Sequence, residues 1–219
     1  MKRTAHFSLG GDLIQRFSNL LVKLLKLNFL TLVFSLPVFT AGASLTAMHH
    51  CLSKVIRQTD DQDDGQLGEQ FLRAFRENFK QATLLWLPFL LIFASALVNV
   101  VILLLAPDTF ADWVVVPAAA AAIVTFLLFQ FVMPMQAHFE NTPLDTLRFA
   151  AILAVAYLPR TVLMAVLWLV PFVLFWNVTL SWPLLLLFGT ALPGYLCARL
   201  CDPVFRRLEE NQEREEAGE

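Results

Sequence analysis

Long runs of apolar residues constrain the fold of this chain more than any other feature. Four of them cover residues 84–106, 113–133, 149–176 and 184–200. A bilayer core about 30 Å thick is crossed by about 20 apolar helical residues, and a helix satisfies its backbone polar groups without water. Composition agrees, since 16% of the residues are charged, against about 25% in an ordinary soluble domain. The sequence therefore predicts an all-α, polytopic transmembrane helical bundle.

The run over residues 149–176 is too long for one straight crossing, and Pro159 and Arg160 interrupt it. As one helix it would extend about 40 Å at 1.5 Å per residue. Proline removes a backbone donor and kinks a helix. We therefore interpret the run as a short interfacial piece joined at a bend to a span over residues 161–176. One tilted, kinked helix is the alternative, and the sequence does not separate the two.

Lys and Arg residues predict the orientation, because the cytoplasmic flanks of membrane helices carry an excess of them. Residues 107–112 and 177–183 contain neither Lys nor Arg. Residues 53–80 contain both types, and residues 137–148 and 202–219 contain Arg. We therefore place the first two loops outside the cell. The other three segments, including the charged C-terminal tail, are expected in the cytoplasm.

The N-terminal region has five cations before its uninterrupted apolar run: Lys2, Arg3, Arg16, Lys23 and Lys26. A single crossing would leave them outside, and two crossings keep them inside. We therefore predict a helical hairpin over residues 13–58. Residues 13–36 cross outward, residues 37–42 form the corner, and residues 43–56 return as a shorter, more polar helix.

The corner of this hairpin contains Pro37, Thr40 and Gly42, and Thr40 is the predicted N-cap of the return helix. Two alternatives remain open. One is a re-entrant hairpin that does not reach the far side. The other is a signal peptide cleaved near Ala41-Gly42-Ala43. The hairpin interpretation gives five strongly apolar segments plus the return helix, about six crossings, and cytoplasmic N- and C-termini.

Residues 59–80 are predicted to form a cytoplasmic loop and a separate amphipathic helix, before core spans over residues 84–201. In that helix, phenylalanines recur every four residues, with cations on the other sides. Such a layout is typical of a helix that lies at the membrane interface. We predict that it anchors the loop, and a helix packed on the bundle is the alternative. The residues are Phe71, Phe75, Phe79, Arg73, Arg76 and Lys80.

Histidines and cysteines form a weak metal-site pattern, with His49, His50 and Cys51 in one segment and Cys197 and Cys201 in another. Imidazole and thiolate suit zinc or copper. However, adjacent residues on a helix point about 100° apart, and the two groups are distant in sequence. We predict no metal and no cofactor. The cysteines are expected to pack as small apolar residues, and the histidines to hydrogen-bond across helices or lie near cytoplasmic headgroups.

Polar residues within the spans are candidates for structural contacts, because exposing them to lipid is costly. Arg160 either pairs inside the membrane with Glu140 or Asp145, or marks the cytoplasmic end of its span. The other candidates are Ser44, Thr46, Asn99, Gln130, Gln136 and His138.

Two motifs carry a resemblance to a known family. LPVFTAGA at residues 36–43 is followed by Thr46-Ala47, and FLRAFRENFKQAT occupies residues 71–83. At this separation they resemble the YesL-like integral membrane proteins of bacteria. The resemblance implies a multi-pass protein of the plasma membrane without an established biochemical activity. It also implies an association with carbohydrate uptake, including ABC-type sugar importers, and it assigns no catalytic residues.

The chain has no GxSxG, HExxH, P-loop or GxGxxG motif. We therefore expect a non-enzymatic protein that contacts the lipid bilayer and no nucleic acid. The resemblance implies sugar importer subunits as its partners, so we expect an accessory or scaffolding role. One alternative is a small transporter or channel, which at this length would need to form a homo-oligomer. A second alternative is a metal-binding membrane enzyme.

Overall fold

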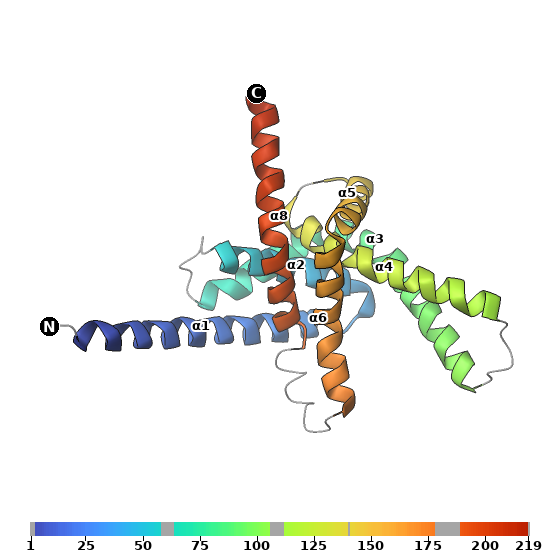
Figure 1. Cartoon of the computed structure of the whole chain (residues 1–219), viewed down its shortest axis with the longest axis horizontal. Helices are drawn as coiled ribbons and strands as arrows, with labels where there is room; N and C mark the ends of the chain where they lie inside the picture. Colours follow the sequence, from blue (N-terminus) through green and yellow to red (C-terminus); the bar gives the residue numbers. More distant parts are fainter. Residues whose placement is uncertain (1–2, 58–63, 106–111, 140, 178–188, 219) are drawn as a thin grey trace.

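The computed structural model describes residues 3–57, 64–105, 112–139, 141–177 and 189–218 (Figure 1). These residues form helices joined by short turns, and no strand occurs among them. The predicted all-α fold is therefore confirmed. The elements are α1 (Arg3–Ser35), η1 (Val38–Thr40), α2 (Ala41–Arg57), α3 (Asp64–Leu105), α4 (Asp112–His138), α5 (Pro143–Ala156), α6 (Leu158–Asn177) and α8 (Ala191–Ala217).

Three helices in this part of the chain are long and apolar enough to cross a membrane. They are Ile14–Ser35 in α1, Gln66–Leu105 in α3 and Val115–His138 in α4. A fourth span results if the bent pair Pro143–Ala156 and Leu158–Pro171 counts as one. Of the predicted span over residues 184–200, residues 184–188 lie outside the described ranges and residues 191–200 belong to α8.

Helices α1 and α2 form the predicted hairpin, with η1 at its corner. The Thr40 hydroxyl lies 2.6 Å from the carbonyl oxygen of Phe34 and 2.7 Å from that of Pro37, and it donates to these acceptors. The prediction that Thr40 accepts an amide as the N-cap of α2 is therefore wrong. Its hydroxyl instead serves carbonyl groups near the end of α1, which lack partners within their own helix.

Helix α3 continues without a break for 42 residues, which corresponds to a length of about 63 Å. The predicted boundary between an amphipathic helix ending at residue 80 and a span beginning at residue 84 is therefore wrong. The residues between them, QAT, include no glycine or proline that would end a helix. One continuous rod thus joins the predicted cytoplasmic segment to the predicted span.

The phenylalanine stripe at the start of α3 faces the α1–α2 hairpin. Phe71 is fully buried, and its ring centroid lies 5.8 Å from that of Phe34. Phe34 also lies 5.0 Å from Phe75, which in turn contacts Phe79 edge-on at 5.5 Å. This segment is therefore a helix packed on the bundle, which was the alternative. The prediction of an interfacial anchor is wrong, because α1 covers the phenylalanine stripe. The cations on the other sides are exposed: Arg73, Arg76 and Lys80.

The run over residues 149–176 belongs to two helices. Helix α5 ends at Ala156, α6 begins at Leu158, and the two are bent by 101°. Pro159 therefore lies in the first turn of α6, where a missing amide hydrogen costs little. The predicted break into two helices is confirmed, and a single kinked helix is wrong. The first piece starts earlier than predicted, because Thr142 caps α5 by accepting from the Asp145 amide at 3.3 Å.

Two clusters of buried side chains hold the body of the molecule together. One joins α3, α4, α5, α6 and α8 around Phe131 and Met164, and the other joins α1, α2, α3 and α8 around Leu27 and Met48. Helix α8 takes part in both clusters. It includes most of the predicted charged tail and ends at Ala217, followed by Gly218, whose φ of 76° suits glycine.

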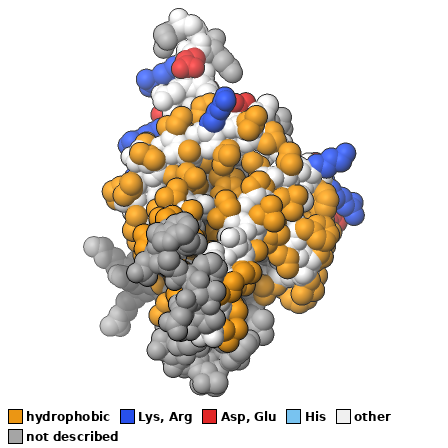
Figure 2. Space-filling model, turned by 90° about the vertical axis from the view of Figure 1, so that its right-hand side faces the viewer, with side chains coloured by type: hydrophobic (Ala, Val, Ile, Leu, Met, Phe, Trp, Pro, Cys, Tyr) orange, Lys and Arg blue, Asp and Glu red, His pale blue; other side chains and the backbone are white. Residues whose placement is uncertain are grey.

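Apolar side chains also cover the outside of the molecule. Helices α3 and α4 extend together away from the body (Figure 1), and only 6% of the most apolar stretch of α3 is buried. Figure 2 views the molecule from that side and shows mostly hydrophobic side chains, with Lys and Arg at the upper margin and the right edge. Soluble monomers rarely expose apolar patches of this extent, so membrane-helix character is supported.

Candidate functional site at the ends of α2 and α4

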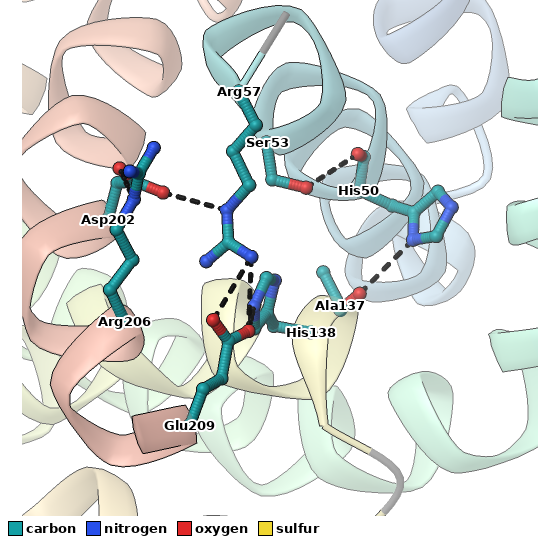
Figure 3. A network of polar contacts seen from close by, with 8 residues as sticks. All are labelled: His50, Ser53, Arg57, Ala137, His138, Asp202, Arg206 and Glu209. Carbon is teal, nitrogen blue, oxygen red and sulfur yellow. Dashed lines mark hydrogen bonds and ion pairs between the residues drawn. The ribbon is translucent and has the colours of Figure 1, made fainter. Parts of the chain in front are cut away.

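A polar network joins α2, α4 and α8 (Figure 3). Arg57, the last residue of α2, donates from Nε to Asp202 Oδ1 at 2.8 Å. It also donates from Nη1 to both carboxylate oxygens of Glu209 at 3.1 Å. Glu209 Oε1 lies 2.5 Å from His138 Nε2, and Arg206 Nε donates to Asp202 Oδ2 at 2.8 Å. A single guanidinium therefore ties the end of α2 to two turns of α8.

Helical spacing explains how α8 presents these groups together. Arg206 and Glu209 follow Asp202 by four and seven residues, so all three lie on one helical face. His138 ends α4 directly opposite this face. Of these residues, only His138 was a candidate from the sequence. The network's other members were missed because Arg57 is separated from Asp202 by 145 residues and from Glu209 by 152.

Burial and hydrogen bonding shift the pKa values of Arg57 and Glu209 in opposite directions. Both residues lie beyond the apolar parts of their helices. Desolvation alone would raise the pKa of Glu209, but hydrogen bonds from Arg57 and His138 outweigh it, and the pKa falls below the usual value. Desolvation would lower the pKa of Arg57, yet its bonds to Glu209 and Asp202 raise it overall. The arrangement therefore favours the charged forms of both side chains.

This shift predicts a loss of stability in acid. The contribution of Glu209 is fully present above its unfolded-state pKa of 4.5 and is lost as the pH falls through the lower pKa of the folded chain. We expect Glu209→Gln to lower the apparent melting temperature at neutral pH and to flatten its decline in acid. Thermal unfolding in mild detergent over a pH series measures this, with the exposed neighbour Glu210→Gln as control. Parallel pH profiles for Glu209→Gln and the unmodified chain would contradict the assignment.

A small cavity of about 20 Å³ lies beside the network, with His49, Ser53, Arg57, Cys201 and Asp202 in its wall. Two buried polar atoms of these residues have no hydrogen-bond partner within the described ranges: His49 Nδ1 and Arg57 Nη2. A volume of this size holds about one water molecule. The cavity is therefore suited to a bridging water and is too small for a sugar.

The predicted weak metal candidates do not converge on one point. Cys51, Cys197 and Cys201 are buried and free, which confirms that they pack as small apolar residues. His50 Nδ1 lies 3.2 Å from the Ala137 carbonyl oxygen, a contact between helices as predicted. His49 is buried and faces the cavity. Among the residues that the structure describes, no three His, Cys, Asp or Glu side chains group in a way that could hold a metal ion.

The polar candidates in the hairpin mostly serve backbone groups. Ser44 donates to the Thr31 carbonyl oxygen at 2.9 Å, which joins α2 to α1. Thr46 donates to the Gly42 carbonyl oxygen at 2.9 Å, four residues earlier in its own helix. Both side chains are fully buried. They stabilise the hairpin and contact no cavity described above.

Candidates in the later helices have separate surroundings. Gln136 links α3 to α5, since it donates to Asn78 Oδ1 and accepts from Thr146 Oγ1, each at 3.4 Å. Gln130 is buried, and its Nε2 has no partner within the described residues. Asn99 lines a groove between α3 and α4.

Arg160 lies in the first turn of α6, with its guanidinium 5.4 Å from the centroid of the Tyr157 ring. Of its two predicted counter-charges, Asp145 contacts Arg148 at 3.9 Å, and Glu140 lies outside the described residues. The position of Arg160 agrees with its interpretation as the marker of one end of a span.

Asn28, on α1, accepts hydrogen bonds from residues at the start of α8. It is fully buried, and its Oδ1 accepts from the backbone and hydroxyl of Thr190 at 2.9 and 2.7 Å and from the Ala191 amide at 3.0 Å. The amides at a helix start lack partners within the helix, so a side-chain acceptor stabilises them. An isolated asparagine inside an apolar helix gave no sequence signal for this role.

We expect Asn28→Ala to destabilise the chain by about 1–3 kcal/mol, the cost of leaving buried donors without an acceptor. The apparent melting temperature in mild detergent measures the loss. Asn99→Ala is the matched control, because this partly exposed asparagine lines a surface groove. Equal melting temperatures for the two variants would show that Asn28 does not hold α8.

Comparisons with known proteins match one part of the chain. No curated protein and no solved structure matches it. A family described as "Protein of unknown function, DUF624" matches residues 24–100. This part runs from α1 through α2 into α3 and contains both sequence motifs at residues 36–47 and 71–83. Over residues 24–100 the chain is therefore similar to the DUF624 family, whose description assigns no function.

Proposed function

We propose that the chain is a non-enzymatic protein of the bacterial plasma membrane that acts as an accessory or scaffolding subunit through lateral helix contacts. One observation carries this proposal: the far half of the α3–α4 hairpin exposes its apolar side chains. Leu97 is 64% exposed, Leu104 77% and Ile123 61%. In a membrane, such side chains contact either lipid or the helices of another protein.

A groove of about 300 Å³ marks where a helix would dock on this hairpin. We call it the α3–α4 surface and define it by Ser95, Ala96, Asn99, Ala118 and Ala121. Small residues let another helix backbone approach closely, and an asparagine hydrogen-bonds across membrane helices. Asn99 facing lipid alone would be costly. The α3–α4 surface therefore favours a protein partner over lipid at this depth.

The class of partner comes from the resemblance to YesL-like proteins, which implies subunits of a sugar importer. The match of residues 24–100 to DUF624 covers both motifs that carry this resemblance. A small oligomeric transporter or channel is the second candidate, since the α3–α4 surface could equally pack against its counterpart in another copy.

The proposal includes about six crossings with cytoplasmic termini, which is more than the three or four candidate spans within the described residues. The positions of the helix ends in Figure 1 support only the common side of the two termini. The ends of the chain and the α4–α5 turn lie toward the left and top, whereas the far ends of α3 and α6 lie at the lower right and bottom. We expect single cysteines at Gly10, Thr40, Gly65 and Asp108 in a cysteine-free chain to be labelled from inside, outside, inside and outside. Labelling of position 10 from outside would contradict the prediction that the hairpin crosses the membrane twice.

Co-purification with sugar importer subunits from native membranes in mild detergent tests the function. We expect the unmodified chain to retain these subunits, and Ala121→Leu, which fills the groove, to release them. Ala119→Leu is the matched control, because residue 119 is exposed on the opposite side of α4. Equal retention by both variants would reject the α3–α4 surface. Solute flux into proteoliposomes containing only this chain would favour the transporter instead.

A further inference from the structure

A second and larger groove opens between α3, α4 and α5. Its volume is about 570 Å³, within the range of about 300–1,000 Å³ typical of small-molecule sites. Among the residues that the structure describes, Thr125 and Thr142 are the only polar ones in its lining, and Ile92 is shared with the groove of the α3–α4 surface. The apolar lining comprises Leu84, Leu85, Pro88, Phe89, Ile92, Leu128, Pro143, Leu144 and Leu147. An apolar wall of this kind suits a hydrocarbon chain.

One hydrogen bond and one bend between helices indicate the level of this groove relative to the bilayer. The Gln81 side chain donates to the Asn141 carbonyl oxygen, which aligns α3 with the start of α5. Helix α5 is bent by 101° from α6, so it lies close to the membrane plane when α6 crosses. The groove therefore begins at the level of the lipid headgroups and follows α3 toward the bilayer interior.

Exposed cations flank the groove at this level. Lys80 precedes the lining residue Leu84 by one helical turn, and Arg148 follows Leu144 by one turn, so each shares a helical face with the groove. The Arg148 side chain is 76% exposed, and its contact with the partly exposed Asp145 is long at 3.9 Å. Such surface contacts contribute little, which leaves the guanidinium able to bind an anion.

We propose that this groove binds one anionic phospholipid of the surrounding bilayer, with an acyl chain against Leu84, Phe89 and Leu147 and the phosphate held by Lys80 and Arg148. Basic pockets between membrane helices on the cytoplasmic side bind anionic headgroups in this way. Guanidinium groups bind phosphate through paired hydrogen bonds. This site is additional to the proposed accessory function, because it requires membrane insertion and no protein partner.

Native mass spectrometry of the full chain in detergent tests the proposal with added phosphatidylglycerol and phosphatidylcholine of identical acyl chains. We expect several-fold higher occupancy by phosphatidylglycerol. Lys80→Gln with Arg148→Gln is expected to abolish this preference while leaving phosphatidylcholine binding unchanged. The matched control pair is Arg73→Gln with Arg76→Gln, since both residues are exposed on the same helix as Lys80 but lie two to three helical turns from the lining residue Leu84.

Leu147→Trp is expected to lower the occupancy of both lipids, because the indole fills the groove. Leu104→Trp, at an exposed site far along α3, is the control for added aromatic surface. Leu144→Trp provides a second test of the groove should Leu147→Trp fail to yield a monodisperse protein. Equal occupancy by the two lipids in the unmodified chain would overturn the anionic site, and unchanged occupancy in the tryptophan variants would overturn the groove. Neither result depends on importer subunits, so the accessory function stands or falls separately.

Discussion

Gly42→Ala is expected to lower the apparent melting temperature of the detergent-solubilised chain more than any other single methyl addition at its described glycines. A Cβ at position 42 would lie 2.4 Å from Trp86 Cβ and 2.8 Å from the Ala82 carbonyl oxygen. Both atoms belong to or adjoin the backbone of α3, so the clash is relieved only by separating α2 from α3. Overpacking of this kind costs about 1–3 kcal/mol, and occasionally more.

Two other glycines provide matched controls in the same assay. At Gly194, an added Cβ would lie 2.6 Å from Met48 Cε, the far end of a flexible side chain that can move aside. At Gly11, no heavy atom lies within 4 Å, and alanine favours helix over glycine. We expect a smaller loss for Gly194→Ala and none for Gly11→Ala. Equal melting temperatures for Gly42→Ala and Gly11→Ala would show that α2 and α3 do not approach this closely.

The sequence predicts those parts of the fold that depend on local features such as prolines and clustered cations. Proline at the corner and cations before it define the α1–α2 hairpin, and Pro159 marks the break near α6. The surroundings of the phenylalanine stripe at the start of α3 were left open, because such a stripe has the same pattern whether it faces lipid or another helix. Only the structure shows that Phe34 of α1 covers it. Three helices, or four with the bent pair, qualify as spans within the described ranges, where the sequence predicts about six crossings.

The candidate site was less predictable than the fold. His138 and the cross-helix role of His50 follow from their position near the ends of apolar helices. Arg57 and Glu209, in contrast, are ordinary charged residues of predicted cytoplasmic segments, and only tertiary packing brings them together. The same holds for Asn28, whose three donors lie at the start of α8, more than 160 residues away.

These unpredicted contacts share one consequence, because they hold α8 against the α1–α2 hairpin at two points. Asn28 stabilises the start of α8, and Arg57 binds its charged half. Gly42 in turn lets α2 pack closely on α3. The hairpin, α8 and the first half of α3 thus form a fixed body, from which the far half of the α3–α4 hairpin extends (Figure 1). A rigid base with an exposed apolar arm suits a protein that acts by lateral contact.

Arg57→Leu is expected to release the charged half of α8 from α2. Breaking a fully buried ion pair costs about 3–5 kcal/mol. The Arg57 and Glu209 side chains are 22% and 33% exposed, and solvent screens the charges left behind, so we expect a loss of about 2 kcal/mol. Hydrogen exchange should increase in residues 202–217 and remain unchanged at the start of α8, where Asn28 still binds. Arg73→Leu, at an exposed arginine of α3, is the control.

Two further variants separate the network from general destabilisation. Arg57→Lys keeps the charge but lacks the planar fork that reaches Asp202 and Glu209 together, so an intermediate loss is expected. The double variant Arg57→Leu with Glu209→Gln should lose less than the sum of the single losses, because the partners share one interaction. Strict additivity, together with unchanged exchange in residues 202–217, would mean that this charged half of α8 is held by its apolar contacts alone. In that case Arg57 and Glu209 would be neighbours without energetic coupling, and the pH dependence expected for Glu209 would also disappear.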